Sequence, residues 1–233
     1  ARMYNIKEVR PLTDPGRINN TGAAISMLCD AYEATGKKKY IEFASKLGDW
    51  MLKSQHTDGS YRAYYKDLSG HDKNSIGVHY TAVVYPAKSV LELALIEKNL
   101  GKTSEEWQER YERHFESVKR AMDDLAKNRD NIDTEGEITF EDGMISCAAL
   151  QLGMTALVTD DEEERRRYTE AAEYLINKHR CLEQMIVPDC RVKDCSLRFW
   201  EAQYDVLYGE NMINSPHGWT SWKTYATYYL YLL

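Results

Sequence analysis

The stretch TGAAISMLCDAYEATG, at residues 21–36, runs directly into KKKYIEFASKLGDWMLKSQ, at residues 37–55. The first segment is rich in small and apolar residues and has a helical period. The second has Lys and Glu on one helical face and apolar residues on the other, namely Ile41, Ala44, Leu47, Trp50 and Leu52. Gly36 lies where the C-cap of the first helix is expected. The two segments together predict one helical hairpin with a tight turn.

This pairing recurs along the chain. Two more apolar segments are each followed by a charged, amphipathic one: residues 85–101 with 104–127, and residues 145–158 with 161–179. A last apolar segment, residues 221–233, has no charged partner after it. A helix that is apolar all round is buried, whereas an amphipathic helix covers it from one side. The pattern predicts an all-α fold, an (α/α) toroid of inner and outer helices, in which residues 1–233 form a single domain that is a fragment of a larger ring.

Composition narrows the class of partner. The net charge is −7, which argues against nucleic acid or an anionic membrane surface as the main partner. The chain has no run of about 18 apolar residues, so no membrane span is expected. It has 17 tyrosines and 5 tryptophans beside only 4 phenylalanines. Aromatic rings with a polar group suit a wet cleft that stacks a ligand and also hydrogen-bonds it.

Neither the cysteines nor the known cofactor motifs point to a metal or cofactor site. Cys29 and Cys147 lie within helical patterns and are expected to be small buried hydrophobes. Three more cysteines and a histidine cluster late in the chain, at spacings that match no common zinc pattern: His179, Cys181, Cys190 and Cys195. The sequence also has no P-loop, GxSxG, HExxH or dinucleotide fingerprint. No metal and no cofactor are therefore expected.

Long segments separate the predicted hairpins, at residues 55–84, 129–144 and 180–218. Each connects an outer helix to the next inner helix, so all three are expected to emerge at the same end of the ring. Segments this long in a compact domain are usually functional. They carry carboxylates, His, Tyr and Trp, which suit a sugar-binding cleft with an aromatic floor.

The hairpin pattern resembles the (α/α) toroids of the six-hairpin glycosidase superfamily. Two short motifs sharpen the resemblance. FEDGM, at residues 140–144, is similar to the Trp-x-Asp-Asp-type motif of unsaturated glucuronyl and rhamnogalacturonyl hydrolases, in which an aspartate is the acid/base. HGWTSW, at residues 217–222, is similar to their Gly-Asn-Gly-Trp motif, which lines the sugar site. Pro216 and His217 stand here where those enzymes often have an arginine. The resemblance implies a carbohydrate-active enzyme in an extracytoplasmic or periplasmic setting.

The first functional hypothesis is a hydrolase that cleaves glycosidic bonds in a uronate-containing polysaccharide or oligosaccharide. The resemblance places the acid/base at Asp142, with Glu141 beside it. An apolar, aromatic pocket would raise the pKa of such a carboxyl group. Glu201 is the candidate for the second carboxylate that a two-carboxylate mechanism requires. The candidate sugar-binding aromatic residues are Trp200, Tyr204, Trp219 and Trp222.

The alternative is a polysaccharide lyase that acts by β-elimination. Such a reaction needs a base, an acid, and a group that neutralises the uronate carboxylate. His79 and Tyr80 could supply the first two, and Arg62 or Arg198 the third. His217 is a further catalytic candidate. A third possibility is a non-catalytic glycan-binding toroid, which would need only the aromatic floor. In each case the partners expected are a saccharide and the remaining hairpins of the parent chain.

Overall fold

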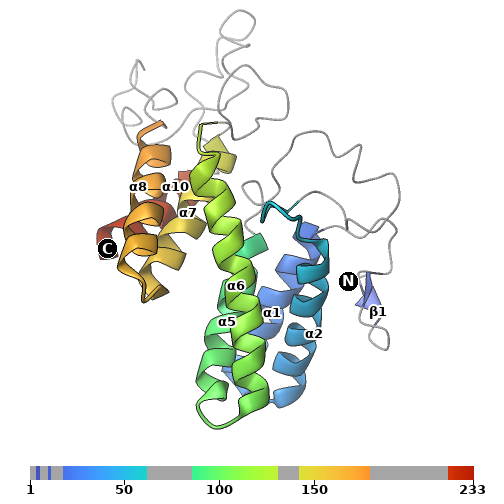
Figure 1. Cartoon of the computed structure of the whole chain (residues 1–233). Coiled ribbons are helices and arrows are strands. Elements are labelled where there is room, and N and C mark those ends of the chain that lie inside the picture. The colour runs from blue at the N-terminus through green and yellow to red at the C-terminus, as the bar shows by residue number, and fades with distance from the viewer. Residues whose placement is uncertain (1–3, 6–9, 12–17, 62–85, 131–141, 179–219) are drawn as a thin grey trace, which may run out of the picture. The chain divides into compact units, whose positions relative to one another are not determined.

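The computed structural model describes residues 4–5, 10–11, 18–61, 86–130, 142–178 and 220–233. The chain divides into two compact units, Ala1–Lys127 and Asn128–Leu233. Helices dominate both units (Figure 1). The described strands, which the sequence analysis did not predict, are β1 (Tyr4–Asn5) and β2 (Arg10–Pro11). They form an antiparallel pair in which Tyr4 lies opposite Pro11.

The first unit contains two helical hairpins. They are built from α1 (Ile18–Thr35) with α2 (Lys38–Ser54), and α5 (Pro86–Gly101) with α6 (Glu105–Lys127). Each hairpin is closed by a short turn (Figure 1). In the first turn Gly36 has a φ of +65°, a conformation that glycine adopts without steric cost, and its N–H donates to Tyr32 O at 2.7 Å. The predicted bounds of these four helices are confirmed to within a few residues.

The two inner helices of this unit, α1 and α5, pack side by side. Gly22, in the second turn of α1, lies against Ser89 and Pro86 in the first turn of α5. One turn further along, Ser26 Oγ donates to Glu92 Oε2 at 2.6 Å. Because residues near both N-termini face each other, the two helices run parallel and begin at the same end. The outer helices α2 and α6 end there, since each is antiparallel to its inner partner.

The second unit repeats this arrangement with α7 (Asp142–Val158), α8 (Glu162–Lys178) and α10 (Thr220–Leu232). Helix α7 packs against both α8 and α10. A Cβ atom on Gly153 of α7 would lie 3.1 Å from Cβ of Tyr229 on α10, so these two helices approach closely. Asp161 precedes α8, and its carboxylate accepts a hydrogen bond from Glu164 N at 2.9 Å, as an N-cap does.

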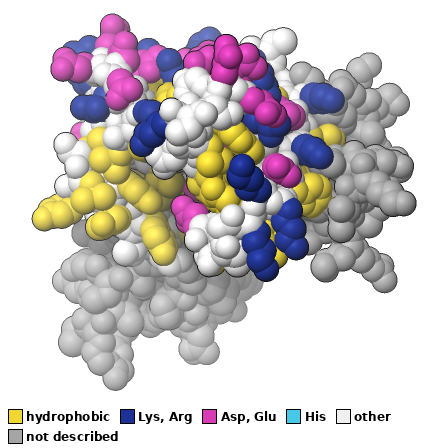
Figure 2. Space-filling view, turned by 90° about the horizontal axis from the view of Figure 1, so that it is seen from below, with side chains coloured by type: hydrophobic (Ala, Val, Ile, Leu, Met, Phe, Trp, Pro, Cys, Tyr) yellow, Lys and Arg dark blue, Asp and Glu magenta, His cyan; other side chains and the backbone are white. Residues whose placement is uncertain are grey.

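The cores of the two units come from the predicted apolar faces. Ile41, Ala44 and Leu47 of α2 are fully buried, and both Cys29 and Cys147 are buried free thiols, as predicted. The face drawn in Figure 2 carries charged side chains beside hydrophobic ones, and no described histidine shows on it. The exposed aromatic side chains of α10 are Tyr225, Tyr228 and Tyr231. A search of the described helices for one long and apolar enough to cross a membrane found none.

Candidate functional site

The end at which the inner helices begin is the candidate site in each unit. Almost every sequence-predicted site residue lies on a segment that enters or leaves this end. Most of these residues are outside the described part of the chain: Arg62, His79, Tyr80, Glu141, Arg198, Trp200, Glu201, Tyr204, His217 and Trp219. Asp142 is the first residue of α7, and the partly buried Trp222 lies in the first turn of α10.

A compact turn, residues 55–61, leads from α2 toward the segment that holds His79 and Tyr80, and we call it the anchor turn. Tyr61 is fully buried, and its hydroxyl lies 2.8 Å from Ser117 Oγ on α6. Ser117 Oγ in turn lies 2.8 Å from Gln55 Oε1. The Gln55 amide nitrogen donates to two carbonyl oxygens, those of Gly59 at 2.7 Å and Ser117 at 2.8 Å. These buried hydrogen bonds fix the turn to α6.

Glycine and aspartate shape the anchor turn itself. Gly59 has a φ of +94°, and a Cβ atom there would lie 2.1 Å from the carbonyl oxygen of Arg120. Only glycine therefore fits this close approach to the backbone of α6. Asp58 Oδ1 accepts a hydrogen bond from Ser60 N at 2.9 Å, and Arg120 Nη2 donates to His56 O at 2.9 Å. The chain thus leaves Tyr61 from a rigid, buried base.

Burial has a clear effect on Tyr61. It raises the pKa of the phenol to about 12, against the opposing effects of the Ser117 hydrogen bond and the Arg120 charge. The hydroxyl therefore stays protonated across the physiological range. It acts as a hydrogen-bonding group in the anchor turn and not as an acid or base.

Polar residues also lie on the inner helices near this end. Ser26 of α1 approaches both Glu92 and Ser89 of α5, the latter at 3.0 Å between the two hydroxyl oxygens. Lys88 forms an ion pair with Glu92 and lies in the first turn of α5. A cation in the first turn opposes the helix dipole, so helix stability alone does not account for its position.

Basic residues recur at this end of the helices in both units. The first turns of α1, α5 and α10 contain no acidic residue, whereas α7 begins with Asp142; Lys88 and Lys223 lie in the first turns of α5 and α10. The outer helices α2, α6 and α8 end here, each with a lysine in its last turn: Lys53, Lys127 and Lys178. By contrast, α6 and α8 begin at the other end with Glu105 and Glu106, and with Glu162 to Glu164. Helix N-termini and lysines favour an anionic ligand.

Sequence reasoning missed the anchor turn and the polar cluster on the inner helices. Two signals could have found them. The Asp-Gly-Ser turn at residues 58–60 is a strong turn signature. Serines and a glutamate within an otherwise apolar helix, as at Ser89 and Glu92, indicate a polar contact across the helix pair. Among the described residues, no group of three or more His, Cys, Asp or Glu side chains could hold a metal ion.

Comparison with known proteins identifies the family. The sequence matches a family model described as pectic acid lyase over residues 5–140, more than half of the chain. The chain belongs to this family. With its helical hairpins, this membership confirms the predicted all-α (α/α) toroid of the carbohydrate-active class. That residues 1–233 form one domain of a larger ring stays a prediction.

Among solved structures, this chain is similar to that of a polysaccharide lyase. The two chains have 12% sequence identity and a TM-score of 0.43, and the match covers 99% of this chain and 39% of that one. The chain therefore spans about two fifths of that protein's length. None of the curated proteins matches the sequence.

Proposed function

We propose that the full protein is a polysaccharide lyase that cleaves a uronate-containing polymer, such as pectic acid, by β-elimination. The observation that carries this proposal is the family match over residues 5–140. The matched range includes three of the lyase candidates, Arg62, His79 and Tyr80, but not Arg198 or His217. It stops just before Glu141 and Asp142, the hydrolase candidates. The match therefore favours the lyase alternative over the hydrolase.

The charge pattern supports an anionic substrate. In each unit, inner-helix N-termini and lysines lie at the candidate end: Lys53, Lys88 and Lys127 in the first unit, and Lys178 and Lys223 in the second. The whole chain nevertheless carries a net charge of −7. Lys88 pairs with Glu92 and Lys178 with Asp130, and the lysines together with the helix N-termini would favour an anionic ligand in each unit. Polyuronate chains carry one carboxylate on each sugar and are ligands of this kind.

The reaction divides into three roles. A base removes the proton next to the uronate carboxylate, the bond from the next carbon to the glycosidic oxygen breaks, and an acid gives a proton to the leaving oxygen. The products are one fragment with a new reducing end and a second fragment whose new non-reducing-end sugar carries a carbon–carbon double bond. We assign the base and the acid to His79 and Tyr80, and the stabilisation of the carboxylate charge to Arg62 or Arg198. His217 is a further candidate for proton transfer.

The anchor turn supports the assignment to this segment. It ends at Tyr61, next to Arg62 and 18 residues before His79. Catalytic groups on a loop need a rigid support, because small displacements cost much of the rate. The buried hydrogen bonds of Tyr61, Ser117 and Gln55 supply such a support at the point where the segment begins.

The experiment measures the ultraviolet absorbance of polygalacturonate while the full-length protein acts on it. A lyase produces a double bond conjugated to the carboxylate, so ultraviolet absorbance rises as the polymer is cut. We expect His79→Ala and Tyr80→Phe to lower kcat by about 100-fold or more, as loss of a general acid or base does. His71→Ala and Tyr64→Phe, in the same segment, are the matched controls and should keep most of the activity.

Three other outcomes would count against the proposal. New reducing ends without a rise in absorbance would indicate hydrolysis, and Asp142→Asn would then be the variant to test. Binding without any cleavage would indicate a glycan-binding toroid. Normal lyase activity in His79→Ala and Tyr80→Phe would leave the reaction type standing but move the catalytic assignment to other residues.

A further inference from the structure

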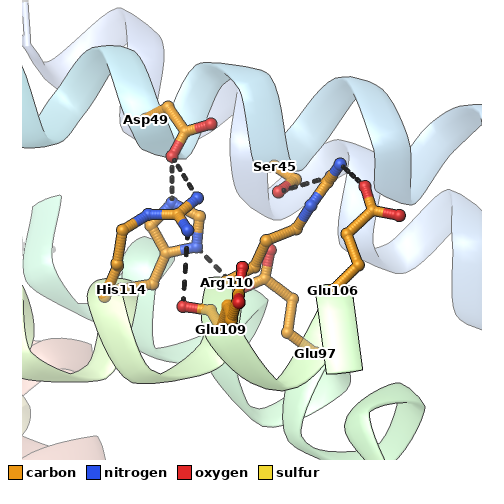
Figure 3. A network of polar contacts seen from close by, with 8 residues as sticks. Ser45, Asp49, Glu97, Glu106, Glu109, Arg110 and His114 are labelled. Carbon is orange, nitrogen blue, oxygen red and sulfur yellow. Dashed lines mark hydrogen bonds and ion pairs between the residues drawn. The ribbon is translucent and has the colours of Figure 1, made fainter. Parts of the chain in front are cut away.

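A second cluster of ionisable groups lies in the first unit, away from the anchor turn. His114 of α6 and Glu97 of α5 are both completely buried. His114 Nδ1 lies 2.6 Å from Glu97 Oε2, and its Nε2 lies 3.5 Å from Asp49 Oδ1 on α2 (Figure 3). The imidazole therefore connects three helices through its two ring nitrogens.

The geometry decides the charge of the ring. A neutral imidazole has one donor nitrogen and one acceptor nitrogen, whereas an ionised carboxylate can only accept. Both nitrogens of His114 face carboxylates, so a neutral ring would direct one lone pair at an acceptor. An imidazolium has two donors: Nδ1–H donates to Glu97, and Nε2–H, which makes no hydrogen bond within the described residues, lies at ion-pair distance from Asp49. The second oxygen of Glu97, Oε1, is buried and has no hydrogen-bond partner among the described residues, which makes a nearby positive charge more important for this carboxylate.

The backbone of α2 leaves space for the ring. A Cβ atom on Gly48 would lie 2.6 Å from His114 Nε2 and 2.6 Å from Leu93 Cδ2. Glycine in the middle of a helix is destabilising relative to alanine, so its presence there needs a packing reason. The absence of a side chain at Gly48 admits the imidazole between α2 and α5.

Charged side chains lie near His114 on each of the three helices that meet at the ring. Arg113 Nη2, on α6, lies 3.1 Å from Asp49 Oδ1 and shares that carboxylate with the histidine. Arg110 of α6 points to Ser45 Oγ of α2 at 3.1 Å and to Glu106 of its own helix (Figure 3). Asp49 faces the ring from α2 and Glu97 from α5. Two carboxylates and one additional cation, Arg113, thus surround the imidazolium.

We propose that His114 is a buried imidazolium that clamps α2, α5 and α6 together, and that the clamp opens when alkaline conditions remove its proton. We call His114, Asp49 and Glu97 the histidine clamp. It is independent of the proposed lyase chemistry. Ser117, which holds the anchor turn, lies one helical turn further along α6, so the clamp and the anchor turn share one helix interface.

The directions of the pKa shifts at His114 and Asp49 agree with a charged imidazole ring. Burial by itself would lower the pKa of His114, but the hydrogen bonds and charges of Asp49 and Glu97 raise it above its ordinary value of 6.5. The stabilisation that the charged His114 contributes is then complete below pH 6.5. It falls as the pH rises toward the raised pKa and is lost above it. Burial opposes the shift at Asp49 too, yet His114 and Arg113 lower its pKa below 3.8. The stabilisation that Asp49 contributes is present above pH 3.8 and is lost as the pH falls through that lowered pKa.

The test titrates the full chain with isotope-labelled histidine, followed by NMR. The six imidazole signals are assigned with His114→Gln, or with Glu97→Gln and Asp49→Asn if that variant does not fold. We expect one imidazole to be charged at neutral pH and to titrate above its ordinary value. In Glu97→Gln, the same signal should titrate at least one pH unit lower. Glu106→Gln is the matched control, because Glu106 pairs with Arg110 and does not face the ring.

Unfolding in urea gives a second readout. With one proton lost, the unfolding equilibrium constant of the natural protein should rise about tenfold per pH unit above 6.5, up to the raised pKa. The same rise should be absent in Glu97→Gln and present in Glu106→Gln. A His114 ring that is neutral at neutral pH would overturn the proposal. So would a titration of His114 that Glu97→Gln leaves unchanged.

Discussion

The hairpins α5–α6 and α7–α8 follow the same sequence plan but bury different chemistry. Each pairs an apolar inner helix with a charged outer helix. The first hairpin nevertheless buries three ionisable residues, Glu97, His114 and Asp124. Among the described residues of the second, no Asp, Glu, His, Lys or Arg side chain is buried, and the buried polar residues are Ser146, Gln151, Thr155, Thr159 and Tyr168.

Two of the neutral groups in the second hairpin form hydrogen bonds within their own helix. Gln151 Nε2 donates to Cys147 O at 3.1 Å, and Thr155 Oγ1 donates to Gln151 O at 2.8 Å, both within α7. Those bonds do not tie one helix to another. In the first hairpin, by contrast, the buried His114–Glu97 pair crosses from α6 to α5. Hairpins that look alike in pattern should therefore respond differently to pH, and four predictions test this difference.

The largest effect is expected at the buried carboxylate. Glu97→Ala leaves the His114 imidazolium buried without its nearest counter-charge, and removing one partner of a buried pair typically costs about 4 kcal/mol. The free energy of unfolding, measured in urea at neutral pH, should fall by about that much. At alkaline pH the loss should be smaller, because the natural protein has already lost the charged clamp. An equal loss at both pH values would contradict the account.

The matched change in the second unit removes an apolar side chain. Leu152 of α7 is completely buried, so Leu152→Ala should cost about 3 kcal/mol through lost burial and a residual cavity. Because no titrating group takes part, the loss should be the same at neutral and alkaline pH. A strong pH dependence here would remove the proposed difference between the hairpins.

Two helical glycines give a smaller, paired comparison. Gly48→Ala places a methyl group 2.6 Å from the imidazole, and we expect a loss of about 2 kcal/mol from overpacking. Gly153→Ala places one 3.1 Å from Cβ of Tyr229, and the better helix propensity of alanine offsets the tighter contact to within about 1 kcal/mol. Thermal unfolding of both variants compares them directly. A larger loss at Gly153 would mean that Gly48 is not reserved for the ring.

The smallest effect is expected at a neutral hydrogen bond in the first unit. Tyr61→Phe removes the hydroxyl that pairs with Ser117 and should cost about 1 kcal/mol. The pKa of Tyr61 is raised to about 12, so the loss should not change between neutral and moderately alkaline pH. Urea unfolding at both pH values checks this. A change with pH would show that the ionic clamp is not the main source of the pH response.

The fold could be predicted from the sequence because helical periodicity is a local property. Apolar runs and amphipathic runs placed all seven described helices to within a few residues, and Gly36 marked the first turn. The strand pair near the N-terminus was missed, since two-residue strands carry no periodic signal. The neighbour of each helix also followed from the order of the chain.

The polar contacts could not be predicted because they depend on which helices meet. His114 reads in the sequence as one charged residue among many in residues 104–127. Its helical position, however, places it on the same face as Ser117, Val118 and Ala121, which are buried. Its partners come from two other helices, 17 and 65 residues away in the chain. The catalytic assignments at His79, Tyr80, Asp142 and Glu141 stay predictions.

The measurement that tests the central claim most directly is the mass of the oligosaccharides that the full-length protein releases from polygalacturonate. Elimination adds no water, so each new chain end that carries the double bond makes its product lighter by one water than the hydrolysis product. We predict products with this deficit, together with their ultraviolet absorbance. Products with the full mass of hydrolysed fragments and no absorbance would contradict the assignment of this protein as a lyase.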